Sequence, residues 1–345
     1  MKKSIAAWEA GFVSIIFLFS LFFLSILSLG MTIYISSTIT IEGLEKNNTS
    51  IMVEMNKFLE DIMETLLSDP SPETNGIDDP VWAWNGKNIR GYTISLAPIS
   101  DRINPNLVRK NVFDKTRLSL LFRPGKNADE LQQFREDSGL FLGHEAFQNF
   151  FEDGLFKKYF SPYGWANINL TDEFAARQLG TSITEDPIKG EALREKIRTL
   201  LMDQQLLDRE NLSTFLGASL TELYPFINAE PLMNINFVDP LILEELIAYP
   251  DYHIRRPEEI TRDILAKRKT ESLNTENICT ILGIDKSNPL FHYFGSITWF
   301  WEIAIETKTE GRKDHSLSAV VCRLPPGAYP VNSKPEYKII ERRFK

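Results

Sequence analysis

The side chains that could act as acids, bases or metal ligands are scattered along this sequence. Its four histidines stand far apart, at His144, His253, His292 and His315. The stretch that begins at His144 lacks the second histidine of a zinc-binding H-E-x-x-H motif, because its fifth residue is Gln148. The sequence also has no G-x-S-x-G, Walker A or G-x-G-x-x-G motif and no C-x-x-C pair. We therefore predict that the protein is not an enzyme.

Pairs of adjacent carboxylates are the next candidates for chemistry. Glu244-Glu245 and Glu258-Glu259 fall in predicted helices, where neighbouring side chains point about 100° apart and do not converge. Asp78-Asp79 fall in a predicted loop and could hold a hard cation such as Ca²⁺. No regular series of oxygen ligands surrounds them, so a structural Ca²⁺ stays open and its ligands unassigned. We assign no other cofactor.

The net charge bears on whether the protein binds nucleic acid, and the two cysteines bear on whether it holds a disulfide. The formal net charge of −9 disfavours nucleic acid as a partner, because an acidic surface repels phosphate. Cys279 and Cys322 are the two cysteines. They could form one disulfide in an oxidising compartment or remain two thiols, since pairing cannot be read from sequence.

A long apolar segment near the N-terminus is the strongest indication of a membrane span in this sequence. Residues 10–41 contain no charged side chain. As a helix rising about 1.5 Å per residue they would extend roughly 48 Å, whereas a bilayer core is about 30 Å thick. Lys2 and Lys3 precede the segment, which favours a cytoplasmic N-terminus. We predict one transmembrane helix over 12–41, with a plain signal anchor as the alternative; a cleaved secretory peptide is disfavoured by the length of the segment.

The segment from 42 to 100 is predicted to hold a helix, a loop and a first strand. Apolar residues recur at helical spacing from Ile51 to Leu66, which predicts an amphipathic helix to about Leu67. Two prolines, Pro70 and Pro72, follow its end. Residues 70–90 have no period and form a loop, and a strand is expected over 91–96.

Three copies of one pattern occupy the predicted helical insertion over 101–290. Each copy opens with an asparagine phrase before an apolar-periodic helix, and a second phrase follows some forty residues later. The opening phrases start near residues 103, 167 and 234, and the second phrases start at Glu145, Glu210 and Glu276.

The opening phrases are interpreted as helix starts. Short polar side chains accept the free N–H groups of a first helical turn, and we assign this capping role to Asn167, Asn169, Asn234 and Asn236. Thr171 and Asp239 fit the same role, and Pro240 suits a first helical position. Gly217 and Gly283 suit helix ends.

The C-terminal segment, 291–345, changes to strand-forming residues. We expect strands within 293–306, over 317–323 and over 337–342. With the strand near 91, they would form one antiparallel sheet. The sequence thus predicts an α+β domain whose sheet is interrupted by an all-helical insertion.

The N-terminal junction Glu9-Ala10-Gly11-Phe12-Val13 resembles the processing site of type IV prepilins and type II secretion pseudopilins. The resemblance implies a leader over 1–11, cleavage after Gly11 and a methylated Phe12 at the mature N-terminus. Most members have Glu at the fifth mature position, which is Ile16 here. The K-type minor pseudopilin is the subunit that lacks this Glu, and the order of Asp78-Asp79, Trp82-Ala83, a strand and an Asn-rich turn is also similar to that subfamily.

The resemblance carries expectations about fold, place and partners. It implies a pilin-like sheet behind a spine helix, a single pass through the inner membrane with the C-terminal domain in the periplasm, and assembly at the tip of a pseudopilus. The implied partners are the I- and J-type minor pseudopilins, the major pseudopilin and the prepilin peptidase. The third copy departs from the family pattern by placing Phe237 where Thr is usual.

Two other classes of function remain as alternatives. Helix-hairpin-helix modules of the competence type carry similar Asn-hydrophobic-Asn phrases and bind DNA through a Gly-hydrophobic-Gly turn. The corresponding stretch here, 248–253, has no glycine and adds the carboxylate of Asp251. A membrane-anchored DNA-binding protein is therefore disfavoured, and a membrane-bound enzyme or another single-span protein with a periplasmic domain is the further alternative.

Overall fold

The computed structural model describes residues 31, 48–138, 143–285, 287–307, 315–325 and 335–345. The chain divides into two compact units, residues 1–58 and 59–345. In the first unit, residues 31 and 48–58 are helical. The predicted transmembrane helix over 12–41 lies outside the described residues, apart from Met31. Among the residues that are described, no helix has both the length and the apolar character needed to cross a membrane.

The second unit opens with helical residues 59–67, so the predicted helix end at Leu67 is confirmed. Leu59, Ile62 and Leu66 form its apolar stripe, and each is at most 2% exposed. Thr65 on this helix accepts a hydrogen bond from the Trp84 indole at 3.0 Å. Trp84 ends the 3₁₀ helix η1 (Pro80–Trp84), which Asp79 caps by accepting from Val81 N.

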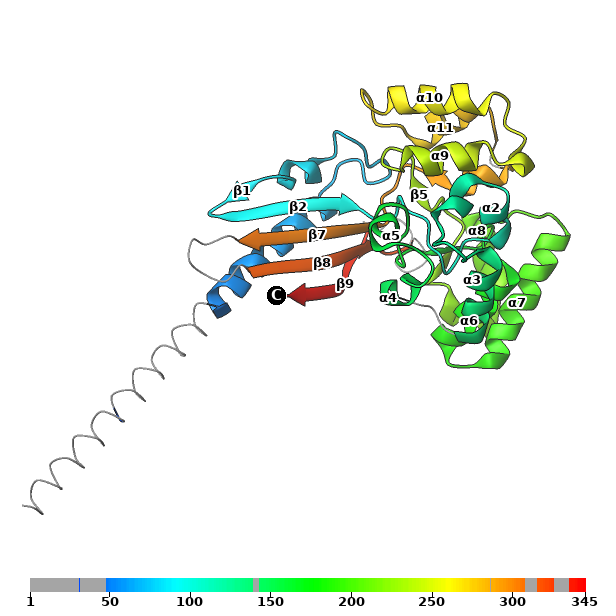
Figure 1. Ribbon diagram of the computed structural model, residues 1–345, viewed down its shortest axis with the longest axis horizontal. Helices are drawn as coiled ribbons and strands as arrows, with labels where there is room; N and C mark the ends of the chain where they lie inside the picture. The colour runs from blue at the N-terminus through cyan, green and yellow to red at the C-terminus, as the bar shows by residue number, and fades with distance from the viewer. Residues whose placement is uncertain (1–30, 32–47, 139–142, 286, 308–314, 326–334) are drawn as a thin grey trace, which may run out of the picture. The chain divides into compact units, whose positions relative to one another are not determined.

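This unit contains a five-stranded antiparallel sheet, in the order β1-β2-β7-β8-β9 (Figure 1). The predicted α+β class and the strands expected near 91, 317 and 337 are confirmed. The strand-forming stretch 293–306 is divided between β6 and β7. The strands are β1 (Asn88–Ile89), β2 (Tyr92–Pro98), β3 (Ala166–Asn167), β4 (Ile227–Asn228), β5 (Met233–Asn234), β6 (Phe294–Gly295), β7 (Phe300–Thr307), β8 (His315–Arg323) and β9 (Tyr337–Phe344).

Alternation along the strands buries one face of the sheet. On β7, Trp301, Ile303 and Ile305 are buried, whereas Glu302 and Glu306 are exposed. The period of two follows from the pleat, which points successive side chains to opposite faces. The other face carries small side chains in register, with Ser95 opposite Ala304 and Ala304 opposite Ser318.

The helical region is inserted between two neighbouring strands. β2 and β7 pair along their length, and Ile99 N donates to Phe300 O at 3.0 Å where the region leaves and rejoins the sheet. Its α-helices are α2 (Lys110–Asp114), α3 (Ala128–Ser138), α4 (His144–Phe147), α5 (Asp153–Tyr159), α6 (Glu173–Thr184), α7 (Pro187–Met202), α8 (Arg209–Leu216), α9 (Pro240–Ile247), α10 (Pro257–Lys267) and α11 (Thr275–Leu282). Short 3₁₀ helices lie among them: η2 (Arg117–Leu121), η3 (Ala218–Leu223), η4 (Pro250–Tyr252) and η5 (Pro289–His292).

The region is not entirely helical, which corrects the prediction. Two-residue parallel strand pairs, β3 with β4 and β5 with β6, close the second and third copies, and a single parallel bridge between Ile103 and Phe160 closes the first. Each copy therefore returns to its own start just before the next copy begins. The bridges exist because the chain segments that meet there are buried, and buried backbone N–H and C=O groups need partners.

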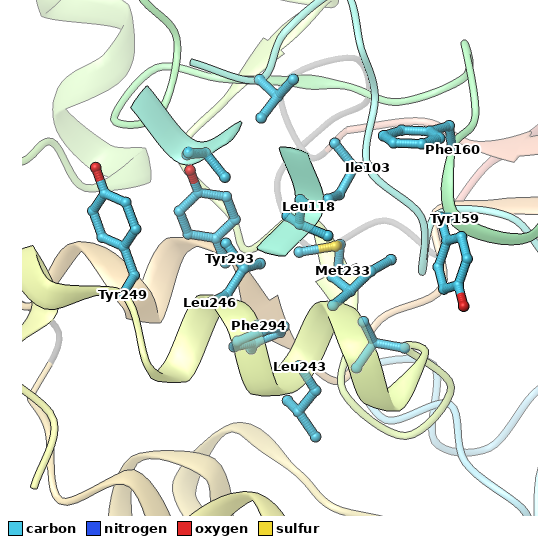
Figure 2. Close-up of a cluster of buried hydrophobic side chains, with 14 of the residues drawn as sticks. Ile103, Leu118, Tyr159, Phe160, Met233, Leu243, Leu246, Tyr249, Tyr293 and Phe294 are labelled. Atoms are coloured by element: carbon cyan, nitrogen blue, oxygen red, sulfur yellow. The ribbon is translucent and has the colours of Figure 1, made fainter. Parts of the chain in front are cut away.

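The first and third copies share one hydrophobic core. Figure 2 shows Ile103, Leu118 and Phe160 of the first copy close to Met233 and Leu246 of the third, within a single cluster of buried side chains. The second copy forms a separate cluster, in which Ile168, Leu193 and Leu212 are buried. The three related segments therefore bury their apolar faces in two clusters.

The second copy contains a close crossing of α6 and α7 that requires glycine. A Cβ on Gly190 would lie 2.1 Å from Thr181 Oγ1 and 2.7 Å from Arg177 O. We expect Gly190→Ala to lower the free energy of unfolding by about 1–3 kcal/mol through overpacking. Urea denaturation of the purified protein measures the change.

The matched control is Gly154→Ala on α5, where no atom lies within 4 Å of the added Cβ. It should be neutral or stabilise by up to about 1 kcal/mol, because alanine is the better helix former. Equal effects at the two positions would contradict the close crossing.

Candidate functional site

The asparagines that open the second and third copies fold their own backbone into a turn. Asn167 Oδ1 accepts from Asn169 N at 2.8 Å, and Asn234 Oδ1 accepts from Asn236 N at 3.0 Å. Each amide nitrogen then reaches across the closing strand pair: Asn167 Nδ2 donates to Glu230 O at 2.7 Å and Asn234 Nδ2 to Ser296 O at 3.1 Å. The first asparagine of each phrase thus joins the start of its copy to the end.

The first copy repeats this arrangement. Asn104 Oδ1 accepts from Asn106 N at 2.9 Å, and Asn104 Nδ2 donates to Pro162 O at 3.1 Å. Pro162 lies just beyond Phe160, the residue that pairs with Ile103. The same side-chain turn and the same closing bond therefore occur in all three copies.

In the second and third copies, the second asparagine of the phrase binds both backbone groups of one distant residue. Asn169 accepts from Leu207 N at 2.8 Å and donates to Leu207 O at 2.9 Å. Asn236 does the same with Leu273 N and O, at 2.8 and 3.0 Å. Leu207 and Leu273 stand directly before the N-cap residues of α8 and α11. These bonds tie the opening phrase of a copy to its second phrase.

The capping role assigned to the four asparagines is therefore wrong. Asn167, Asn169, Asn234 and Asn236 are between 0% and 5% exposed, and none of them caps a helix. Asp172 caps α6 by accepting from Ala175 N, and Asp239 caps α9 by accepting from Leu241 N. Thr171 donates to Asn167 O instead of capping. An asparagine amide offers both a donor and an acceptor, which suits it to bridge two backbone segments, whereas an aspartate only accepts.

Other sequence expectations at the helix ends hold. Pro240 occupies the first turn of α9. Gly217 and Gly283 end α8 and α11 with φ of 69° and 65°, a conformation in which glycine pays no steric penalty.

Asn75 connects the third copy to the rest of the unit. Its backbone O accepts from Asn234 Nδ2 at 2.8 Å and from Asn236 Nδ2 at 3.0 Å. Its side-chain Oδ1 accepts from Thr298 N at 2.8 Å, and its Nδ2 donates to Asp79 Oδ2 at 2.6 Å. Asn75 is fully buried, and we call Asn75, Asn234 and Asn236 the asparagine node. Sequence reasoning missed Asn75, because nothing in the sequence of the 70–90 loop links it to residues so far along the chain.

Two neighbouring features show how closely this loop is held. A Cβ on Gly76 would lie 1.9 Å from Ser272 Oγ, so the loop fits against the third copy only with glycine at this position. Burial raises the pKa of the Asp79 carboxyl above its ordinary value of 3.8, against the opposing effect of the bonds from Val81 N and Asn75. Asp79 therefore points inward, and its neighbour Asp78 is exposed.

His292, the last residue of η5, is buried against the second copy. Its Nδ1 is 3.3 Å from both Ala229 O and Asn169 Nδ2, and the residue is 3% exposed. Burial lowers the pKa of His292 below its ordinary value of 6.5, although the bond to Ala229 O opposes the shift. The fold therefore favours the neutral imidazole.

The described residues contain no cluster of the side chains that usually bind metals. No group of three or more His, Cys, Asp or Glu side chains among them could hold a metal ion. A groove of about 1390 Å³ runs between α4, α5 and the outer face of the sheet. Within it, His144 pairs with Asp153 at 3.0 Å and Tyr163 donates to Glu341. Cys279 and Cys322 do not form a disulfide with each other.

The remaining predicted sites fall elsewhere. The processing residues Gly11 and Phe12 and the fifth mature residue Ile16 lie outside the described residues. The turn that a helix-hairpin-helix would use for phosphate contains η4, where Asp251 pairs with Lys115 at 2.8 Å. The site that the structure brings together is thus the asparagine node, which joins segments and has no reactive group.

A prediction concerns the amide nitrogen of Asn236. Asn236→Asp replaces a donor that serves Asn75 O and Leu273 O with a charged acceptor facing two carbonyls. We expect the free energy of unfolding to fall by about 3 kcal/mol, because a charge is buried with Leu273 N as its one remaining donor and both carbonyls lose their partner. Urea denaturation at neutral pH measures the loss.

Asn127→Asp is the isosteric control. Exposed Asn127 uses only its oxygen, which accepts from Glu130 N at the start of α3, and Asp keeps that acceptor. The change should stay within about 0.5 kcal/mol. An Asn236→Asp variant as stable as this control would show that the node contributes little.

A second prediction concerns pH. Because the folded pKa of His292 is lowered, the unfolded chain takes up a proton that the folded chain resists as pH falls below 6.5. The stabilisation is complete above that pH and is lost as pH falls toward the folded pKa. We expect His292→Gln to lose less stability than the wild type between pH 7 and pH 5, measured as melting temperature against pH. Replacing exposed His253 by Asn should leave the wild-type slope, and equal slopes for all three proteins would contradict the prediction.

Comparison with known proteins yields distant matches among solved structures only. No protein-family model and no curated protein matches the chain. Among solved structures, the fold is similar to a chain of the crystal structure of the GspK-GspI-GspJ complex from the type 2 secretion system of enterotoxigenic Escherichia coli. The match is 12% identical with a TM-score of 0.40, and it covers 87% of this chain and 99% of that one. The type II secretion system is also the one whose pseudopilins the N-terminal junction resembles.

Proposed function

We propose that this protein is the K-type minor pseudopilin of a type II secretion system, which initiates and caps a periplasmic pseudopilus and so supports protein export across the outer membrane. Its role would be assembly and not catalysis. The observation that carries the proposal is the placement of a three-copy helical region between the adjacent strands β2 and β7 of an antiparallel sheet. This architecture follows an N-terminal helix and an apolar segment that begins after Gly11.

The size of the insertion supports a position at the filament tip. The region runs from Ile99 to Phe300, which is more of the chain than the sheet itself occupies. Subunits that repeat along a helical filament are surrounded by copies on all sides, and a side insertion of this size would collide with them. A subunit at the end has one side without neighbours, where such an insertion is accommodated.

Ile16 supports the same position on electrostatic grounds. A carboxylate in a lipid-embedded helix is tolerated when a charge of opposite sign pairs with it. In the pseudopilin family, that partner is the N-terminal ammonium of a neighbouring subunit. A subunit with no neighbour above it would leave the carboxylate unpaired, so an apolar residue at the fifth mature position is the more stable choice.

The proposal includes a location and a set of partners. The N-terminal segment would cross the inner membrane once, with the sheet and the helical region in the periplasm. I- and J-type minor pseudopilins would join it at the tip, the major pseudopilin would continue the filament, and the prepilin peptidase would remove residues 1–11. Packing between the apolar helices of these subunits would replace lipid contacts and draw the protein out of the bilayer.

DNA binding receives less support from the same residues. A phosphate would meet the carboxylate of Asp251 in the turn of η4, already paired with Lys115, and a chain with a net charge of −9. The asparagine phrases resemble those of DNA-binding modules, but their side-chain amides donate hydrogen bonds to the protein's own backbone.

Mass spectrometry of the mature N-terminus tests the proposal. In cells with an active prepilin peptidase, we expect the wild type to begin at methylated Phe12. Gly11→Asp should retain Met1 and abolish export, because the peptidase cuts after a glycine. Gly43→Asp, the same change beyond the apolar segment, should be processed normally. Export unaffected by Gly11→Asp, or a wild type that retains Met1, would refute the assignment.

A further inference from the structure

The last strand of the sheet has an open edge. In the order β1-β2-β7-β8-β9, only β8 pairs with β9 among the described residues (Figure 1). β9 runs from Tyr337 to Phe344, whereas the strand at the opposite edge, β1, has two residues. An edge strand of this length presents a row of backbone donors and acceptors to another chain.

The register shows which backbone groups point away from β8. Lys345 and Ser316 exchange both of their backbone bonds at 2.9 Å, and Leu324 N donates to Glu336 O at 2.8 Å. In an antiparallel ladder, bonded and non-bonded positions alternate. The register shifts between Val320 and Val321, where Ile340 is skipped, so the alternation is counted from each end of β9 separately. By that count Phe344 and Ile339 are at non-bonded positions, and their N–H and C=O groups face the outer side of β9.

The side chains of β9 combine apolar contact with positive charge. Ile339 and Ile340 are 37% and 46% exposed, which is unusual for adjacent isoleucines. Lys338, Arg342, Arg343 and Lys345 supply four cations, in a protein whose net charge is −9. Glu341 is the carboxylate among them; it accepts from Tyr163 and pairs with Arg343, which leaves the other three cations in excess of negative charge on this strand.

We propose that the outer edge of β9 binds an extended acidic segment of a different polypeptide, which adds to the sheet as a sixth strand. The backbone groups of Ile339 and Phe344 would provide the register, the two isoleucines would contact apolar side chains on the added strand, and the cations would select acidic residues. A second copy of β9 fits poorly, because edge-to-edge pairing would bring the cations of the two strands together. This inference rests on the edge itself and does not depend on the proposed secretion role.

Fluorescence anisotropy of a labelled peptide tests the edge in the full-length protein in detergent. The probe is a decapeptide that alternates Glu with Val, and its partner probe alternates Lys with Val. We expect the acidic peptide to bind and the basic peptide to bind at least tenfold more weakly, with the difference shrinking as salt is raised. Hydrogen exchange should show new protection at the amides of Ile339 and Phe344 when the acidic peptide is present.

Two variants separate edge pairing from simple charge attraction. Ile339→Pro removes an outward-facing N–H and leaves the pairing with β8, so it should weaken binding about tenfold while Ile339→Ala retains most of it. A double variant, Lys338→Glu with Lys345→Glu, keeps the backbone and should reverse the preference between the two peptides.

Several outcomes would overturn the proposal. They are failure of the wild type to bind the acidic peptide, equal binding of both peptides, equal binding by the proline and alanine variants, and unchanged exchange at Ile339 and Phe344. Sedimentation velocity adds one more: self-association of the wild type that Ile339→Pro abolishes would assign the edge to a second copy instead.

Discussion

Everything in the helical region depends on satisfying buried backbone groups where distant segments meet. The strand pairs that close the copies are two residues long or shorter, too short to satisfy these groups by a ladder. Asparagine side chains supply what the ladder lacks: Asn169 and Asn236 each bond both the N–H and the C=O of one leucine. Leaving one of these buried backbone groups without a partner costs about 1–3 kcal/mol. The asparagine amides therefore fix how the two segments align, which hydrophobic contact alone would not do.

The same bonds explain how a large insertion coexists with a regular sheet. The region leaves β2 and returns to β7 through adjacent residues, so the pairing of these strands is undisturbed. Asn75 then fixes the third copy against the loop after the first helix and against Thr298 at the entry to β7. The first copy shares its core with the third, and the second copy extends outward on its own cluster. The asparagine node thus joins the third copy to the loop and the sheet, and the shared core joins the third copy to the first.

These features fit a protein whose work is assembly. The asparagines that the sequence pattern identifies form hydrogen bonds within the protein. In the groove beside α5, His144 pairs with Asp153 and Tyr163 donates to Glu341. The edge of β9 that we propose as a docking site offers backbone groups, and the outer face of the sheet beside it carries small side chains. Pairing of backbone groups would align an added strand with β9, and the basic side chains of an otherwise acidic chain would select an acidic partner.

The amino-acid sequence by itself determined the elements and the repetition. The helix end at Leu67, the strands near residues 91, 317 and 337, and the glycines that end α8 and α11 could be predicted, because periodicity and local backbone preference act over a few residues. The tertiary structure alone decided what the asparagines do. Asparagine suits both the capping of a helix and the bridging of two backbone segments. Which of the two roles it takes depends on whether a partner such as Leu273 or Asn75 is brought within 3 Å of its side chain. That depends on contacts between residues far apart in the chain, which local pattern does not encode.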